Sequence, residues 1–173
     1  MKSISIVLTA ALAALACAEP NLPVAQDFEL ERFQGHWYEV SRIPRHYDEL
    51  CHDTTADYTL MDRQRLQVVH ACRLGSASGT ERRVIAGARI TEPDQPAKLT
   101  LTIGSYAGDY WVLDVSEDYD LAVVGHPSRL MLWVLSRSPQ VEPDRLAAVR
   151  RLVDDLGFNP DLLVPTPHST ELH

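Results

Sequence analysis

The side chains with the greatest potential for covalent chemistry are two cysteines in the middle of the chain, Cys51 and Cys72. Neither belongs to a CxxC motif, the spacing typical of redox and zinc sites. Together with neighbouring histidines they could bind a metal, or they could form a disulfide. We expect the disulfide, because the leader described below directs the chain to an oxidising compartment. In addition, a turn centred near Arg63 would place Cys72 across from about Thr54, three positions from Cys51.

The remaining residues with catalytic potential do not form a known catalytic pattern. Ser41, Ser136 and Ser138 lack the Gly-x-Ser-x-Gly context of a nucleophile elbow. The sequence has no GxGxxG or Walker loop and no HExxH motif. The seven histidines are scattered, without a pair at metal-ligand spacing. We therefore expect a protein that is not an enzyme and that has no cofactor and no metal site.

The third cysteine, Cys17, directly follows an N-terminal leader. Lys2 supplies a positive charge, and Ile4–Ala16 is an apolar run of 13 residues, whereas a transmembrane helix needs about 20. The run ends in small residues, and together with Cys17 they resemble the lipobox at which bacterial lipoproteins are cleaved and acylated on the cysteine. We expect a signal peptide over residues 1–16, a lipid anchor on Cys17 and a tether over residues 17–30.

Ordinary secretion is the alternative, because Ala14 with Ala16, and Ala16 with Ala18, are also acceptable cleavage signals. In a lipoprotein, an aspartate after the cysteine is the usual signal for retention in the inner membrane, and this chain has Ala18 there. We therefore expect a protein that is lipid-anchored in the cell outer membrane, on its periplasmic face.

The charge of the chain excludes several classes of partner. The formal net charge is −8, and loss of Lys2 with the leader makes it −9. Nucleic acids and anionic lipid surfaces attract basic patches, so neither is expected as a direct electrostatic partner. Two acids on predicted strands, Glu39 and Asp114, either face the interior or point outward.

Short β-rich runs separated by turn residues extend from Trp37 to Arg137. They cover Trp37–Ile43, Thr54–Leu60, Leu66–Cys72, Arg82–Thr91, Lys98–Ile103, Tyr110–Val115, Leu121–Gly125 and Leu130–Arg137. Such even spacing indicates an all-β fold, either an antiparallel sandwich or an up-and-down barrel. A helix is predicted to begin at Pro143 and to end before Gly157. We expect one domain over residues 31–164 and a loose tail over residues 165–173.

Alternation along the runs shows which side chains share a face. In the fourth run one face carries Arg83 and Arg89, so the face with Val84 and Ala86 must point inward. A small residue such as Ala86 suits an interior that leaves space for a ligand. Similar reasoning selects further candidates for the interior lining, namely Ala56, Tyr58, Leu101, Ile103, Met131 and Trp133.

The first and last runs contain a pair of residues that can close one end of a barrel. Trp37 lies in a Gly-x-Trp-Tyr turn that enters the first run, and Arg137 ends the last run. A guanidinium can lie flat on an indole ring, a cation–π contact worth about 0.5–2 kcal/mol. A barrel closed in this way is a cup with one open end.

Three blocks of the sequence, in this order, resemble the conserved blocks of the lipocalins, and within them the bacterial outer-membrane lipoproteins and apolipoprotein D. The blocks are Gly35–Val40, Tyr110–Val124 and Leu132–Pro139. The resemblance implies an eight-stranded antiparallel up-and-down barrel with one C-terminal α-helix packed outside. By the family's pattern Tyr110 and Val112 also face the cavity, with Tyr110 nearer the open end.

The resemblance also implies a small hydrophobic ligand. For the bacterial branch it implies fatty acids or lysophospholipids, and a role in lipid storage, transport or membrane maintenance. One alternative is a carrier of a planar pigment such as a bilin, a retinoid or haem, and another is a catalytic lipocalin that uses a free thiol of Cys51 or Cys72. A homodimer is possible, and the sequence does not choose the ligand.

Overall fold

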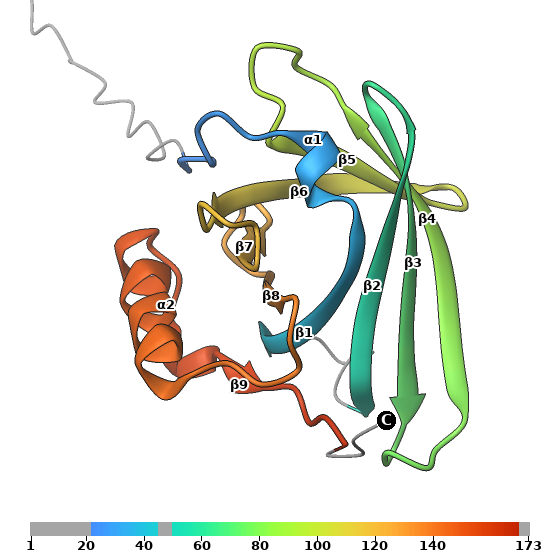
Figure 1. Cartoon of the computed structure of the whole chain (residues 1–173), viewed down its shortest axis with the longest axis vertical. Helices are drawn as coiled ribbons and strands as arrows, with labels where there is room; N and C mark the ends of the chain where they lie inside the picture. Colours follow the sequence, from blue (N-terminus) through green and yellow to red (C-terminus); the bar gives the residue numbers. More distant parts are fainter. Residues whose placement is uncertain (1–21, 45–49, 170–173) are drawn as a thin grey trace, which may run out of the picture.

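The computed structural model describes residues 22–44 and 50–169, so the predicted signal peptide and Cys17 lie outside the described residues. The strands form one antiparallel sheet that closes into a barrel (Figure 1). They are β1 (Gly35–Ile43), β2 (Cys51–Asp62), β3 (Arg65–Leu74), β4 (Glu81–Ile90), β5 (Lys98–Ile103), β6 (Tyr106–Val115), β7 (Leu121–Gly125) and β8 (Leu132–Ser136), with a short β9 (Val164–Pro165). Each strand from β2 to β8 pairs with the next, and β1 pairs with both β8 and β2. The predicted eight-stranded up-and-down barrel is confirmed.

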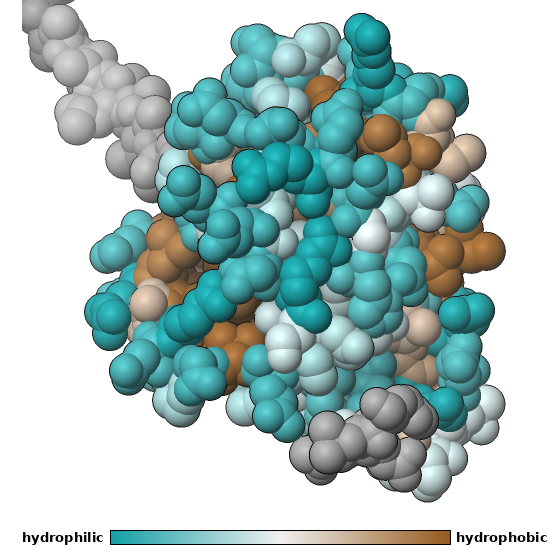
Figure 2. Space-filling view, viewed as in Figure 1, coloured by the Kyte–Doolittle hydropathy of each residue, from teal (hydrophilic) through white to brown (hydrophobic). Residues whose placement is uncertain are grey.

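In the described part of the chain, three helical segments accompany the barrel. They are α1 (Leu30–Phe33), α2 (Pro143–Asp155) and the 3₁₀-helix η1 (Pro160–Leu162). Within the described ranges, none of the helices has the length and apolar character to cross a membrane. Figure 2 shows that hydrophilic residues cover most of one face of the molecule, in keeping with the charged composition.

Helix α2 covers the outer face of the last strands. Its buried residues Val149 and Val153 pack in one cluster with Leu113 of β6 and with Leu132 and Val134 of β8. In β6 and β8 both faces carry apolar side chains, so these strands need a cover outside the barrel as well as a core inside. The helix therefore lies where the sequence pattern requires it.

The barrel end next to α1 is closed by Trp37 and Arg137. Trp37 is fully buried, and its indole Nε1 donates to the carbonyl oxygen of Phe33 at 2.7 Å. The Arg137 guanidinium lies over the indole ring, 3.8 Å from its centroid. Its nitrogens also donate to the carbonyl oxygens of His36 at 2.7 Å and Gln34 at 2.8 Å. Arg137 thus joins the end of β8 to the chain that enters β1.

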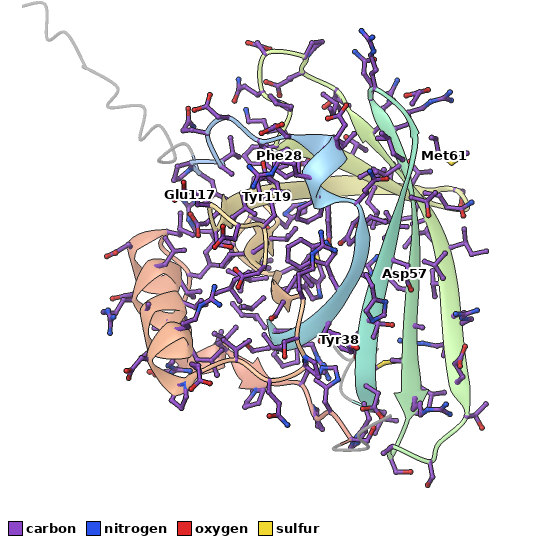
Figure 3. The ribbon with its side chains drawn as sticks, in the orientation of Figure 1. Phe28, Tyr38, Asp57, Met61, Glu117 and Tyr119 are labelled. Atoms are coloured by element: carbon purple, nitrogen blue, oxygen red, sulfur yellow. A yellow bond between two sulfur atoms is a disulfide. The ribbon has the colours of Figure 1, made fainter. Side chains whose placement is uncertain are left out.

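The predicted tether over residues 17–30 is wrong from residue 22 onward, because this segment packs against the closed end of the barrel. Leu22 and Phe28 are buried, and Phe28 stacks on Tyr119 with ring centroids 6.2 Å apart (Figure 3). The backbone N–H of Glu29 donates to the Tyr119 hydroxyl at 2.8 Å. Apolar side chains in this segment explain the difference, because they gain free energy by covering the closed end.

The predicted loose tail over residues 165–173 is also wrong for residues 165–169, the part that the structure describes. These residues are held against the barrel. Strands β1 and β2 pair with each other only over Gly35–Tyr38 and Thr55–Tyr58, so farther along their facing edges need other partners. The C-terminal segment, defined here as Val164–Ser169, supplies them. Val164 and Pro165 pair with β1, and the Asp53 N–H of β2 donates to the Pro167 carbonyl oxygen at 2.8 Å.

A disulfide joins Cys51 and Cys72, as expected, with the two Cα atoms 5.4 Å apart. It links the start of β2 to the end of β3, at the barrel end opposite Trp37. A β-bulge between His52 and Thr55 shifts the register of the two strands near this bond.

The closing pair gives a stability prediction. Trp37→Ala should lower the free energy of unfolding by about 3–5 kcal/mol through the cavity that it leaves. Arg137→Ala should cost at least about 2 kcal/mol through lost charged hydrogen bonds, and Arg137→Lys should recover only part of this. The double variant, measured by urea denaturation, should be less damaging than the sum because the two side chains touch. Strict additivity would contradict the contact.

The disulfide gives a second prediction. Replacing both Cys51 and Cys72 by alanine should lower the free energy of unfolding by about 3 kcal/mol, because the unfolded chain loses a constraint on a loop of this size. Urea denaturation of the variant and of wild-type protein with and without reductant measures the effect. Two free thiols in denatured, non-reduced wild-type protein would rule the bond out.

Candidate ligand-binding site

A cavity of about 750 Å³ occupies the half of the barrel away from α1. Its lining includes residues at the strand ends farthest from Trp37, such as Cys51 at the start of β2, Ile103 at the end of β5 and Tyr106 at the start of β6. In an up-and-down barrel these ends all meet at one rim. The cavity is therefore a cup that opens at this rim.

One wall of the cavity is apolar. It is formed by six residues that the sequence analysis selected: Val84, Leu101, Ile103, Tyr110, Met131 and Trp133. Tyr110 and Trp133 pack against each other, with ring centroids 5.7 Å apart. This wall extends from β4 through β6 to β8, and it can receive an alkyl chain or a ring without leaving polar groups unpaired.

The other four selected residues do not line the cavity, so their assignment is corrected. Ala56, Tyr58, Ala86 and Val112 are buried in the core of the closed end. They do face inward, but Phe28, Phe33 and Trp37 fill that half of the interior. Alternation in the sequence shows which face of a strand a side chain lies on. It does not show how far along the barrel axis the side chain lies.

Tyr110 lies deeper than the family pattern suggested. Its hydroxyl bonds to the Tyr58 hydroxyl at 2.5 Å, and both side chains are buried. Burial is the largest cause that raises the pKa of each tyrosine above its usual value. The pair therefore forms a neutral floor between the filled and the open half of the barrel, and Tyr110 is not a rim residue.

The opposite wall is polar, and sequence reasoning largely missed it. It includes Glu39 and Arg42 of β1, Thr54 of β2 and His70 of β3. Glu39 follows Trp37 by two positions and so shares its inward face, a signal that was present in the sequence. Arg42 would point outward by simple alternation, but a β-bulge between Glu39 and Ser41 turns it inward.

Glu39 and Arg42 form a buried ion pair within this wall. Arg42 Nη1 lies 2.6 Å from Glu39 Oε1, and the side chains are only 4% and 9% exposed, Arg42 and Glu39 respectively. The Thr166 hydroxyl, from the C-terminal segment, donates to Glu39 Oε1 at 2.7 Å and accepts from Arg42 Nη1 at 2.9 Å. Burial raises the pKa of the Glu39 carboxyl, while Arg42 and Thr166 act in the opposite direction.

His70 and the disulfide complete the polar wall toward the rim. Burial lowers the pKa of His70 to about 4, so its ring is neutral at physiological pH. Both half-cystines line the cavity, and Arg82 Nη2 donates to Cys51 Sγ at 3.2 Å. The cavity thus has a largely apolar side from β4 to β8, with Asp109, His126 and Ser128 near the rim, and a polar side from β1 to β4.

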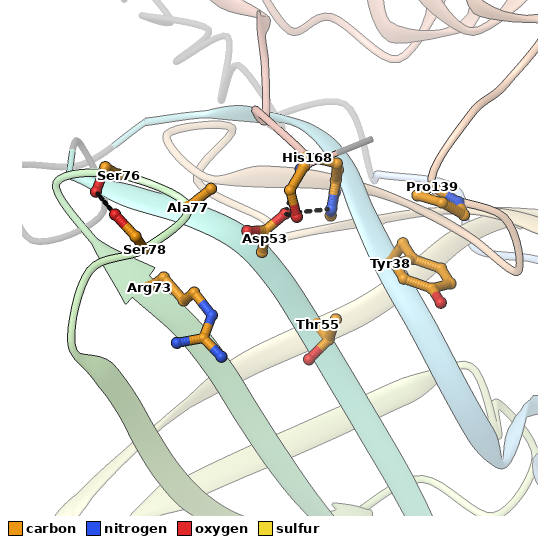
Figure 4. Close-up of a pocket in the computed structure, with 10 residues that line it drawn as sticks. Tyr38, Asp53, Thr55, Arg73, Ser76, Ala77, Ser78, Pro139 and His168 are labelled. Atoms are coloured by element: carbon orange, nitrogen blue, oxygen red, sulfur yellow. Dashed lines mark hydrogen bonds and ion pairs between the residues drawn. The ribbon is translucent and has the colours of Figure 1, made fainter. Parts of the chain in front are cut away.

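A second hollow, of about 660 Å³, lies on the outer face of the barrel (Figure 4). Residues from β1, β2, β3 and the C-terminal segment line it, among them Tyr38, Asp53, Arg73 and His168. The Asp53 carboxylate accepts from the Ser169 N–H and hydroxyl. Most of the residues that line this hollow are polar or charged, so it suits a hydrophobic ligand less well than the cavity inside the barrel does.

The described ranges, 22–44 and 50–169, contain no group of three His, Cys, Asp or Glu side chains placed to hold a metal ion. The main cavity can bind a molecule that has both an apolar part and a few polar atoms. Its apolar wall stabilises an apolar body at about 25 cal/mol per Å² buried, and its polar wall can pair with a few polar atoms.

Comparison with known proteins agrees with this geometry. A family model described as a lipocalin-like domain matches residues 28–168. Temperature-induced lipocalin-1 of Arabidopsis thaliana is 29% identical over 160 residues, 86% of this chain and 84% of the relative. Outer membrane lipoprotein Blc of Escherichia coli is 30% identical over 152 residues, 83% and 85% of the two chains.

Solved structures show the same architecture. Insecticyanin from the tobacco hornworm Manduca sexta superposes with a TM-score of 0.68 at 19% identity, over 87% of this chain and 86% of that one. Lobster apocrustacyanin A1 superposes with a TM-score of 0.66 at 12% identity, over 81% and 79%. With the family model covering the barrel, the helix and part of the C-terminal segment, the chain belongs to the lipocalins, a family that binds small hydrophobic ligands.

Proposed function

We propose that this protein binds a long-chain amphiphile, a fatty acid or a lysophospholipid, and serves in lipid storage, transport or membrane maintenance. The observation that carries the proposal is the cavity, with an apolar wall of six residues and a polar wall that begins at Glu39. An acyl chain fits the first wall, and a polar head group finds partners on the second. The small hydrophobic ligands of the lipocalin family are in keeping with such an amphiphile.

Binding rather than catalysis is the activity that we propose. A catalytic lipocalin of the thiol type needs a free cysteine facing the ligand. Cys51 and Cys72 face the cavity but are joined to each other, so neither is a free nucleophile.

Attachment to the outer membrane through Cys17 is part of the same proposal. The supporting observations are the leader with its small residues before Cys17 and the similarity to outer membrane lipoproteins of three bacteria. A triacylated cysteine exceeds the two hydrophobic signals that stable anchoring requires.

The ligand site gives a prediction with a matched control on the same strand. Lysophosphatidylethanolamine should bind with micromolar affinity, about −8 kcal/mol, and should change the fluorescence of Trp133. Val84→Trp fills cavity space and should weaken binding at least tenfold in calorimetry. Ile85→Trp, at the neighbouring position that is 64% exposed, should bind like wild type. Both variants should keep the melting temperature within a few degrees.

A folded Val84→Trp variant with unchanged affinity would show that the ligand does not lie inside the barrel. A visible absorbance band in freshly purified wild-type protein would favour a planar pigment over a lipid.

The anchor gives a separate prediction. Wild-type protein expressed in a Gram-negative host should incorporate an alkyne-labelled fatty acid and should sediment with the membrane fraction. Cys17→Ser should lose the label and move to the soluble fraction, because the thiol that carries the lipid is gone. A membrane-bound wild type without label would overturn the assignment.

A further inference from the structure

The hollow on the outer face of the barrel has no role in the proposed function. Its volume of about 660 Å³ lies within the range of about 300–1,000 Å³ that is typical of small-molecule sites. Outward-facing side chains of three neighbouring strands form its base. Tyr38 of β1 and Thr55 of β2 are direct partners across the sheet, and Arg73 lies on β3, the next strand. The loop between β3 and β4 and the C-terminal segment form its borders.

The aromatic part of this hollow is the Tyr38 ring, which two imidazole rings hold in place. His36 packs edge to face with it, with centroids 4.7 Å apart, and His168 does so at 5.7 Å. His168 is itself fixed, because its Nε2 donates to the carbonyl oxygen of Glu39 at 2.7 Å. The ring is therefore positioned before a ligand arrives, which lowers the ordering cost of binding.

Asp53 supplies the hollow with a hydrogen-bond acceptor. Its Oδ1 accepts from the N–H and the hydroxyl of Ser169, and His168 Nδ1 lies 3.7 Å from the same oxygen. Among the described residues, no group donates a hydrogen bond to the second oxygen, Oδ2. Asp53 lines the hollow, so Oδ2 is available to a ligand there.

Arg73 supplies the same hollow with donors. In the described part of the chain its guanidinium makes one hydrogen bond, from Nη1 to the carbonyl oxygen of Gly79 at 3.3 Å, which leaves Nε and Nη2 available. Over the same residues, no ion pair joins Arg73 to Asp53. Figure 4 shows Thr55 between the Arg73 side chain and the Tyr38 ring, and its hydroxyl can donate or accept. The hollow thus combines an aromatic surface with a separate acceptor and a separate group of donors.

We propose that this hollow binds a neutral saccharide. A sugar ring has an apolar C–H face, which can pack on Tyr38, and an edge of hydroxyl groups that both donate and accept. Asp53 Oδ2 accepts from such hydroxyls, and the planar fork of Arg73 can donate to two adjacent ones. The formal net charge of −8 disfavours an anionic ligand. A small zwitterion could pair with both charges but would leave the aromatic surface unused.

Titration of the ¹⁵N-labelled full chain with maltotriose and with triacetylchitotriose, followed by NMR, tests the site. At least one of them should bind with a dissociation constant of about 1 mM, as expected for an open site with few contacts. It should shift the backbone signals of Thr55 and Ser76, which line the hollow. The signals of Val84 and Leu101, which line the barrel cavity, should not move.

Two variants remove the polar contacts without removing the fold. Arg73→Gln takes away the fork of donors and should weaken binding at least about fivefold. Asp53→Asn should do the same, because it keeps one oxygen for Ser169 and replaces the available acceptor by an amide. Asparagine also tolerates the left-handed backbone of this position, φ 49°. The matched control is Arg83→Gln on β4, an exposed arginine that pairs with Glu81 and should bind like wild type.

The aromatic contact is tested on Tyr38 itself. Tyr38→Leu should weaken binding at least about fivefold, whereas Tyr38→Phe keeps the ring and should stay within about twofold of wild type. Unchanged affinity in folded Arg73→Gln, Asp53→Asn and Tyr38→Leu variants would overturn the proposal.

Two further outcomes would also overturn it. One is the absence of shifts with either trisaccharide up to about 20 mM. The other is binding of glycine in place of both trisaccharides, which would assign the hollow to a zwitterion. Neither outcome bears on lipid binding, because no described residue lines both the hollow and the barrel cavity.

Discussion

The barrel depends on the contact between Arg137 and Trp37. A single guanidinium covers an indole ring and bonds to the carbonyl oxygens of Gln34 and His36. It thereby ties the last strand of the barrel to the turn that begins the first one. Because this contact closes one end of the barrel, aromatic side chains can pack together in that half of the interior without contact with water.

Because one half is filled, the other half defines the site. The paired hydroxyls of Tyr58 and Tyr110 mark the boundary. On the open side of this boundary, strands β4 to β8 supply a largely apolar wall, and β1 to β4 supply a polar one. Such a division suits a molecule with an apolar body and a few hydrogen-bonding atoms along one side. In this chain, the ligand site of the family is thus a cavity in one half of the barrel, with walls of different polarity.

Local patterns in the sequence were enough to predict the strands, helix α2, the closing pair and the disulfide, because each depends on alternation, spacing or an even cysteine count. The site was predicted only in part. Ala86 and Val84 share one face of β4, and only the aromatic residues brought from α1 and β1 decide that Ala86 is core and Val84 is cavity. Arg42 was missed because a β-bulge changes its direction. Thr166 was missed because its partner Glu39 is 127 positions away in sequence.

The C-terminal segment has a consequence for how the molecule responds to events on its outside. Thr166 bonds to Glu39 and Arg42 from behind, while the same two residues face the ligand space. A ligand that contacts Glu39 or Arg42 would therefore be thermodynamically linked to the C-terminal segment through this shared ion pair. By reciprocity, whatever loosens the segment weakens or reshapes the site, and whatever fills the site changes how firmly the segment is held. Such a ligand would couple the inner surface of the barrel wall to its outer surface through Glu39, Arg42 and Thr166.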